Sequence, residues 1–250
     1  MALLEQAVVN YTLAVVEATC HQFRALMPEM ASTHPLPFFG PLSSARVITL
    51  GLNPSAGEFA PLRKWPAVIS AADLTERLVS YWTSGSPEPH PWFQPWSQCL
   101  SEMGASYHLD AAHVDLSPRA TKAAGQFRRE PLKSLFLDML RTDAPVWVEA
   151  LRCATKCSLV LAAGSATNAY YINEFIRDEF PNSGVRLDGD WQRSRGQGQT
   201  TWHAMRLPGG REIPVFFCST GPTKDGGSVL VNACRKHLTA LKPFLASAKD

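Results

Sequence analysis

The side chains best suited to chemistry in this sequence follow four short apolar runs. Asn53 lies in the stretch GLNPS at 51–55, and its amide can both donate and accept hydrogen bonds. Asp115 ends the second run with a carboxylate, and Ser219 and Thr220 follow the last run with hydroxyl groups. The third run ends in Gly-Ser-Ala-Thr. Four small polar stretches, each bearing Gly or Pro, predict one polar pocket rimmed by backbone N–H groups.

The four apolar runs predict buried strands of a parallel sheet, because helical patterns separate most of them along the chain. In an open α/β sheet, ligands collect beyond the carboxyl ends of the strands, where the polar stretches lie. We expect a three-layer α/β/α sandwich with a central four-stranded, mostly parallel sheet and right-handed crossovers. The expected strands are residues 47–50, 112–116, 159–163 and 215–218, and the expected helices are residues 3–28, 92–104, 131–152, 166–179 and 228–246.

Residues 183–213 interrupt the alternation of strands and helices. Their Gly/Gln-rich sequence and short β-like segments predict a hairpin excursion within the domain. No internal repeat, low-complexity tract or clear boundary occurs, so we expect a single domain over residues 1–250.

Composition excludes several classes of protein. Of the 250 residues, 45% are hydrophobic and 18% are charged, so the chain is neither a disordered tail nor a coiled coil. The N-terminal segment carries Glu5 and Glu17 and lacks a basic start, which predicts an amphipathic helix and neither a signal peptide nor a membrane span. The net charge of +2 does not by itself indicate a polyanionic partner, so local basic clusters must support one.

Six cysteines are scattered along the chain, and only Cys153 and Cys157 lie close in sequence. Their C-x3-C spacing alone makes no structural zinc or iron–sulfur motif, so we expect no metal. Free thiols fit a reducing cytosol, which favours a cytoplasmic protein. No G-x-G-x-x-G, Walker or G-x-S-x-G pattern occurs, so we expect no nucleotide cofactor and no α/β-hydrolase elbow.

Three of the polar stretches resemble motifs of the uracil-DNA glycosylase superfamily. GLNPS at 51–55 is similar to the first motif of its mismatch-specific and single-strand-selective branches, which have Gly-hydrophobic-Asn-Pro-Gly after the first strand. LVLAAGSAT at 159–167 resembles the third strand and its turn, and CSTGPTKDGG at 218–227 occupies the place of the second motif. The resemblance implies a monofunctional glycosylase that flips uracil out of DNA and hydrolyses its N-glycosidic bond in base excision repair.

The resemblance implies two catalytic residues. Asn53 would orient the attacking water, with Pro54 fixing the turn that directs it. Asp115 stands where the best-known branch has an Asn that recognises uracil. A buried, protonated Asp115 could bind the base, whereas an ionised Asp115 would act as a general base and leave Asn53 to position the substrate. The same residues also suit plain turns after strands.

The second motif departs further from the family. Some branches have a His in this loop that stabilises the uracil anion, and no His occurs between Ile213 and Leu230. Stabilisation of the leaving group would then depend on backbone N–H groups, Ser219 or Thr220. His237 lies deep in the last expected helix, where we expect it to face the core or the solvent.

Contacts to the flipped base also follow from the resemblance. An aromatic side chain should stack on the base, for which Phe59 and Trp65 rank together and Phe93 is a third candidate. The remaining substrate-binding residues are expected at the tips of the first and last strands: Gly51, Leu52, Ser55, Ser219 and Thr220.

Basic residues gather near the expected mouth of the pocket. In the family, the loop in the position of residues 221–224 presses on the DNA backbone before a helix start. The expected DNA-binding residues are Arg119, Lys122, Gly221, Pro222, Thr223 and Lys224, with Arg128, Arg129, Arg193 and Arg195 nearby. A local basic rim on a nearly neutral chain predicts salt-sensitive binding to uracil-containing DNA, and we expect a monomer.

Other functions stay open. The missing His favours a non-catalytic nucleic-acid or nucleobase binding protein of the same fold, which would bind DNA without forming an abasic product. A small-molecule enzyme acting on a free nucleoside would lack salt-dependent DNA binding. For a glycosylase, hypoxanthine, xanthine or mispaired thymine are alternatives to uracil.

Overall fold

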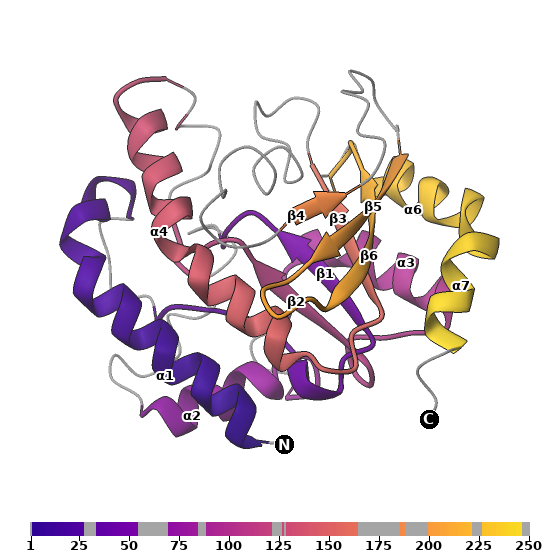
Figure 1. Ribbon diagram of the computed structural model, residues 1–250, viewed down its shortest axis with the longest axis horizontal. Helices are drawn as coiled ribbons and strands as arrows, with labels where there is room; N and C mark the ends of the chain where they lie inside the picture. The colour runs from indigo at the N-terminus through magenta and orange to yellow at the C-terminus, as the bar shows by residue number, and fades with distance from the viewer. Residues whose placement is uncertain are drawn as a thin grey trace.

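A six-stranded sheet forms the centre of the molecule (Figure 1). The computed structural model describes residues 2–27, 34–54, 70–84, 89–121, 127, 129–164, 186–188, 200–221 and 227–246. The strands are β1 (Val47–Gly51), β2 (Ala111–Asp115), β3 (Leu159–Ala163), β4 (Arg186–Asp188), β5 (Thr200–Arg206) and β6 (Glu212–Cys218). They lie in the order β2-β1-β3-β6-β5-β4.

The pairing of the strands confirms the expected parallel core. β2, β1, β3 and β6 pair in parallel, whereas β5 pairs antiparallel with both β6 and β4. The expected number of four strands is wrong, because β4 and β5 from the excursion after β3 extend the same sheet. The four parallel strands end at one edge, so the tips that carry the polar stretches share that edge.

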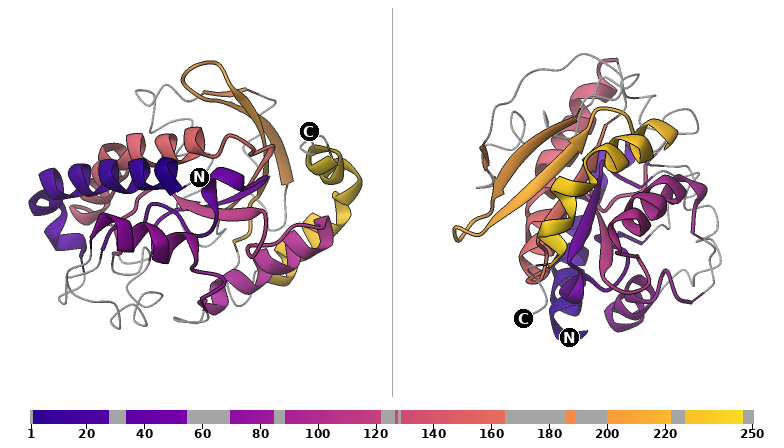
Figure 2. Two further views of the ribbon diagram at one scale, coloured as in Figure 1. Left: turned by 90° about the horizontal axis from the view of Figure 1, so that it is seen from below. Right: turned by 90° about the vertical axis from the view of Figure 1, so that its right-hand side faces the viewer.

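Helices cover both sides of the sheet, which confirms the α/β/α arrangement. One side carries α1 (Ala2–Thr19) and α4 (Leu132–Cys153), and the other carries α3 (Gln94–Met103), α6 (Gly227–Lys236) and α7 (Leu238–Ala246) (Figure 1 and Figure 2). α2 (Ala71–Val79) packs against α1. Short 3₁₀ helices are η1 (Cys20–Leu26), η2 (Leu42–Ser44) and η4 (Pro91–Phe93). None of the helices in the described ranges is long and apolar enough to cross a membrane.

The short parallel strands are stable because both of their faces are buried. Every residue of β1, β2 and β3 is buried, including Val47, Ile48 and Leu50 of β1. Burial of one such aliphatic side chain contributes about 1.5–3 kcal/mol. Burial of all five residues of β1 therefore fixes the strand, and it also fixes the position at which the loop after β1 begins.

The helix α2 is absent from the elements expected from the sequence. It begins with a reciprocal capping box, in which Ser70 Oγ accepts from Asp73 N–H at 3.1 Å and Asp73 Oδ2 accepts from Ser70 N–H at 3.2 Å. The Ser70 hydroxyl also donates to Asp73 Oδ2 at 2.6 Å, and this bond together with the one from Ser70 N–H lowers the pKa of the Asp73 carboxyl. The S-x-x-D signature was thus a local signal for this helix start.

The antiparallel pairing of β4 with β5 fits the hairpin expected within residues 183–213, whose Gly/Gln-rich turn lies outside the described residues. β5 also forms a hairpin with β6. Gly209 and Gly210 make the turn with φ angles of +95° and +87°, a region that favours glycine. Leu207 N–H closes the turn by donating to Arg211 O at 2.8 Å. β4 pairs with the outer edge of β5, so the described strands of the excursion widen the sheet.

Two of the expected long helices are divided. Residues 3–28 contain α1 followed by η1, and residues 228–246 contain α6 and α7 with His237 between them. His237 is half-buried, with Nε2 3.0 Å from Thr200 Oγ1 and its ring 5.3 Å from that of Phe216. It therefore contacts the side of the sheet near β5 and β6. The helix expected at 166–179 lies outside the described residues.

Candidate functional site

The loops after β1 and β2 are joined beyond the end of the sheet. Leu116 N–H donates to Gly51 O at 3.1 Å, and Thr121 N–H donates to Pro54 O at 3.0 Å. These bonds continue the parallel pairing of the two strands into their loops. The first two polar stretches of the sequence therefore form one structural unit.

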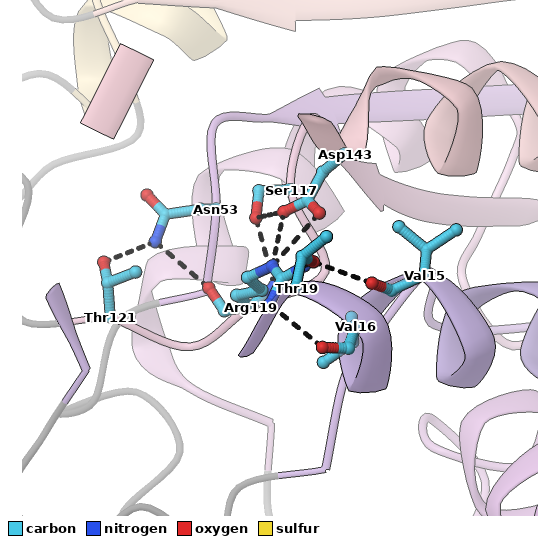
Figure 3. A network of polar contacts seen from close by, with 8 residues as sticks. All are labelled: Val15, Val16, Thr19, Asn53, Ser117, Arg119, Thr121 and Asp143. Atoms are coloured by element: carbon cyan, nitrogen blue, oxygen red, sulfur yellow. Dashed lines mark hydrogen bonds and ion pairs between the residues drawn. The ribbon is translucent and has the colours of Figure 1, made fainter. Parts of the chain in front are cut away.

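Asn53 is held at this junction by its amino group. Nδ2 donates to Thr121 Oγ1 at 2.7 Å, to Pro54 O at 2.8 Å and, more weakly, to Arg119 O at 3.4 Å. Figure 3 shows Oδ1 pointing away from Thr121 and Arg119, and no group in the described ranges donates to it. The half-buried carboxamide thus offers only its oxygen, which can accept a hydrogen bond from a water or a base.

Asp115 lies on the neighbouring tip, directly across from Gly51 in the β1–β2 register. It is 6% exposed, and its Oδ1 lies 3.3 Å from His113 Nε2. A Cβ added to Gly51 would lie 2.1 Å from Asp115 Oδ1 and 2.8 Å from His113 Nε2. The missing side chain of Gly51 is what lets the carboxylate lie close to the backbone of β1, so Gly51 supports Asp115 and need not touch a ligand itself.

Gly51→Ala is expected to lower the free energy of unfolding by about 1–3 kcal/mol, because the new methyl overlaps Asp115 and His113. For a chain of this size the melting temperature should fall by about 2–12 °C. Thermal unfolding followed by circular dichroism measures the loss. In an Asp115→Ala background the same substitution should cost less, and equal costs in both backgrounds would contradict the close contact.

Arg119 corrects one expectation from the sequence. It is 3% exposed, and its Nε donates to both oxygens of the fully buried Asp143 at 3.0 and 2.9 Å (Figure 3). Its Nη2 donates to Thr19 Oγ1 at the end of α1, and Ser117 Oγ donates to Asp143 Oδ2 at 2.6 Å. Burial raises the pKa of the Asp143 carboxyl, and Arg119 and Ser117 oppose that rise. A guanidinium so enclosed cannot contact phosphate, so the expected DNA-binding role of Arg119 is wrong.

The tips of β3 and β6 are joined in the same way as those of β1 and β2. Gly164 N–H donates to Cys218 O at 3.0 Å. Ser219, Thr220 and Gly221 follow β6 and are all buried, and burial raises the pKa of the Cys218 thiol to about 11. Ser219 and Thr220 directly follow β6 at the carboxyl edge of the sheet, but their side chains are largely covered.

The aromatic candidate Phe93 belongs to the core. It is 2% exposed, and its ring centroid lies 4.8 Å from that of Trp82 and 5.0 Å from that of His113. It is therefore not available to stack on a base, and this expectation is wrong. Several other candidates lie outside the described residues: Ser55, Phe59, Trp65, Lys122, Arg128, Arg193, Arg195, Pro222, Thr223 and Lys224.

A groove of about 440 Å³ lies beside the loop that holds Asn53. Its lining includes Val16, His21, Arg24, Met27, Arg119 and Ala120. His21 and Arg24 are exposed, unlike Arg119 in the same groove. They are therefore the basic side chains of this groove that can donate to a ligand from solvent. Sequence reasoning missed them because they are distant from the motifs along the chain and belong to η1.

His113 is the functional candidate that sequence reasoning overlooked. It lies inside β2, two residues before Asp115, and it is 1% exposed. Its Nδ1 lies 2.8 Å from Thr49 Oγ1 on β1. A histidine within an otherwise apolar run was the available signal, because a buried imidazole needs polar partners.

Metal ligands do not gather in the part of the chain that the structure describes. Within it, no three His, Cys, Asp or Glu side chains are arranged to hold a metal ion. Burial raises the pKa of the Cys153 thiol to about 12 and that of Cys157 to about 11. Both stay protonated near neutral pH, so they are poor ligands and poor nucleophiles.

No known family model matches the chain, and no curated protein sequence matches it significantly. The class of protein therefore follows from fold and site alone. The fold is an α/β/α sandwich, and an amide and a carboxylate lie on adjoining tips of its parallel sheet. In open α/β sheets, ligands bind beyond the carboxyl ends of the parallel strands, where this pair lies.

Proposed function

We propose that the protein is a monofunctional DNA glycosylase, which hydrolyses the N-glycosidic bond of uracil flipped out of DNA and so begins base excision repair. The observation that carries the proposal is that backbone hydrogen bonds join the loops after β1 and β2. These loops place the Asn53 amide and the Asp115 carboxylate on adjoining strand tips. The resemblance of GLNPS to the first glycosylase motif supports it. The protein would act as a cytoplasmic monomer without a cofactor.

The proposed chemistry needs a placed water and fixed charges more than a covalent intermediate. Breaking the bond leaves an oxocarbenium-like sugar and an anionic base. An ionised Asp115 stabilises the positive sugar and accepts a proton from the attacking water. Asn53 Oδ1 accepts the other hydrogen of that water, because Thr121 and the loop carbonyls already occupy its amino group. The base anion depends on backbone N–H groups near the β6 tip, since Ser219 and Thr220 are buried.

The DNA strand would approach along the groove beside η1. His21 and Arg24 supply exposed donors for phosphate there, and Arg129 is exposed near the start of α4. Phosphate contacts of this kind position DNA without reading its sequence. So few exposed cations predict weak binding that falls as salt rises.

A binding protein without catalysis is the second candidate. The observation that favours it is the 6% exposure of Asp115, which leaves little of the carboxylate open to a water. Such a protein would bind uracil-containing DNA and release it unchanged.

Asn53→Ala is the substitution that tests the proposed function. The unchanged protein is expected to convert uracil-containing oligonucleotides, single- or double-stranded, into abasic products that alkali cleaves on a denaturing gel. Asn53→Ala should lower the single-turnover rate by about 10²-fold, because the water loses its acceptor and its position.

Asn232→Ala provides the matched control. Asn232 is exposed on α6, so its removal should leave the rate unchanged. DNA binding by the unchanged protein without any abasic product would reject the glycosylase in favour of the binding protein. Cleavage that survives Asn53→Ala in full would remove Asn53 from the site.

A further inference from the structure

The amino group of Asn53 is surrounded by oxygen atoms. Its Nδ2 lies 2.7 Å from Thr121 Oγ1, 2.8 Å from Pro54 O and 3.4 Å from Arg119 O. Two of these three oxygens are backbone carbonyls, which accept hydrogen bonds and cannot donate them. A carboxamide amino group carries two hydrogens, so the two nearer oxygens, on Thr121 and Pro54, occupy both of them.

The same contacts exclude the reverse orientation of the amide. A flipped Asn53 would place Oδ1 2.8 Å from Pro54 O and 3.4 Å from Arg119 O, with no hydrogen between the oxygens. Both of those bonds would be lost, and lone pairs would face lone pairs. The three contacts therefore hold Nδ2 toward the loop, and Figure 3 shows Oδ1 on the opposite side of the side chain.

Thr121 is itself fixed in the loop after β2. It is fully buried, and its N–H donates to Pro54 O at 3.0 Å, the same carbonyl that accepts from Asn53. Arg119, two residues earlier, binds Asp143 of α4. A β-branched side chain also has few accessible rotamers. The Thr121 hydroxyl is therefore held beside the Asn53 amide from both the backbone and the loop.

The orientation of the amide decides what a water beside Asn53 can do. A water attacks through a lone pair of its oxygen and donates through its hydrogens. An amide oxygen accepts one of those hydrogens and leaves the lone pairs free. An amino group in the same place would donate to a lone pair and make the water a poorer nucleophile.

We propose that Thr121 is a positioning residue, which sets the Asn53 amide with Oδ1 toward the ligand and so keeps the lone pairs of the bound water available for attack on the sugar. This inference rests on the proposed function for its effect on the rate. The orientation of the amide does not depend on any activity. Thr121 acts through Asn53, to which it gives a hydroxyl acceptor.

NMR of the ¹⁵N-labelled full chain tests the orientation directly. The Asn53 side-chain amide is assigned by its absence in Asn53→Ala, and the exposed Asn232 on α6 serves as the reference. Both amide hydrogens of Asn53 should exchange with solvent about 10-fold more slowly than those of Asn232, because both are hydrogen-bonded. Equal exchange rates would overturn the proposal. The result is read whether or not uracil is excised, so it is separate from the test of the glycosylase.

Thr121→Val deletes the hydroxyl and keeps the shape of the side chain. One amide hydrogen of Asn53 should lose its protection, and the single-turnover rate should fall about 10-fold, which corresponds to one hydrogen bond. Thr121→Ser keeps the hydroxyl and should stay within a few-fold of the unchanged protein. Equal rates for the two variants would show that the hydroxyl does not position Asn53.

Thr12→Val is the matched control. Thr12 is as fully buried as Thr121, and its hydroxyl donates to Val8 O at 2.7 Å within α1. Its removal should leave the rate and the Asn53 amide signals unchanged, with the fold of each variant checked by circular dichroism.

The kinetics of Thr121→Val also separate positioning from binding. Loss of positioning should lower the maximal single-turnover rate and leave unchanged the protein concentration that gives half of it. A rise in that concentration at an unchanged maximal rate would make Thr121 a DNA-binding residue and would contradict the proposal.

Discussion

Asp115→Asn is expected to lower the single-turnover rate of uracil excision by about 10²- to 10⁴-fold, the usual contribution of a general base. The amide can still form a hydrogen bond with His113 Nε2, because it carries both a donor and an acceptor, so the substitution preserves the shape of the site. It removes the negative charge beside the sugar and the acceptor for the water's proton. Rapid-quench kinetics with excess enzyme measures the chemical step without product release.

The same substitution separates the two roles that the sequence left open for Asp115. If a protonated carboxyl recognised the base, an amide would do the same with a donor and an acceptor, and the rate would hold or rise. A rate within a few-fold of the unchanged protein therefore contradicts the general base. Asp110→Asn is a useful control, since Asp110 lies at the other end of β2 and pairs with Arg46.

Asp143→Ala is expected to lower the free energy of unfolding by about 3–5 kcal/mol. Asp143 is fully buried and binds Arg119 through both carboxylate oxygens, so its removal leaves a buried guanidinium without its counter-charge. For a chain of 150–250 residues this corresponds to a fall in melting temperature of about 6–20 °C. Chemical denaturation and calorimetry measure the two quantities.

Two further variants make the test of this ion pair specific. Asp138→Ala removes a carboxylate from the same helix, and its pair with Arg141 is exposed, so it should cost at most about 1 kcal/mol. Combining Asp143→Leu with Arg119→Met removes both charges and should recover most of the lost stability. If Asp143→Ala costs no more than Asp138→Ala, the pair does not anchor the loop.

The ion pair also bears on the candidate site, because the backbone carbonyl of Arg119 and the hydroxyl of Thr121 hold the Asn53 amide. The loop after β2 is tied to α4 through Asp143 and to α1 through Thr19. Loss of the pair should therefore disturb Asn53 as well as stability. The buried side chain of Arg119 therefore supports the candidate site through its backbone carbonyl and the loop that it anchors.

The sequence by itself determined the parallel core and the edge where its tips meet. The runs at 47–50, 112–116 and 159–163 match β1, β2 and β3 to within one residue, because a buried strand is recognisable from a local apolar run. The hairpin expected within residues 183–213 is matched by the antiparallel pairing of β4 with β5, and its Gly/Gln-rich turn lies outside the described residues. The capping box at the start of α2 is an equally local signal, and it would have predicted this helix from the sequence.

Only the tertiary structure decided how each polar side chain is used. Arg119 was expected to be a surface cation, but it is buried and binds Asp143, 24 residues further along the chain. Phe93 was expected to stack on a base, but it is buried in the aromatic core. The sheet gained two strands because β5 paired with β6 in the same sheet. His113 acquired its partners from the register of β1 against β2. Burial and pairing depend on neighbours that are remote in sequence, and residue type and spacing do not specify those neighbours.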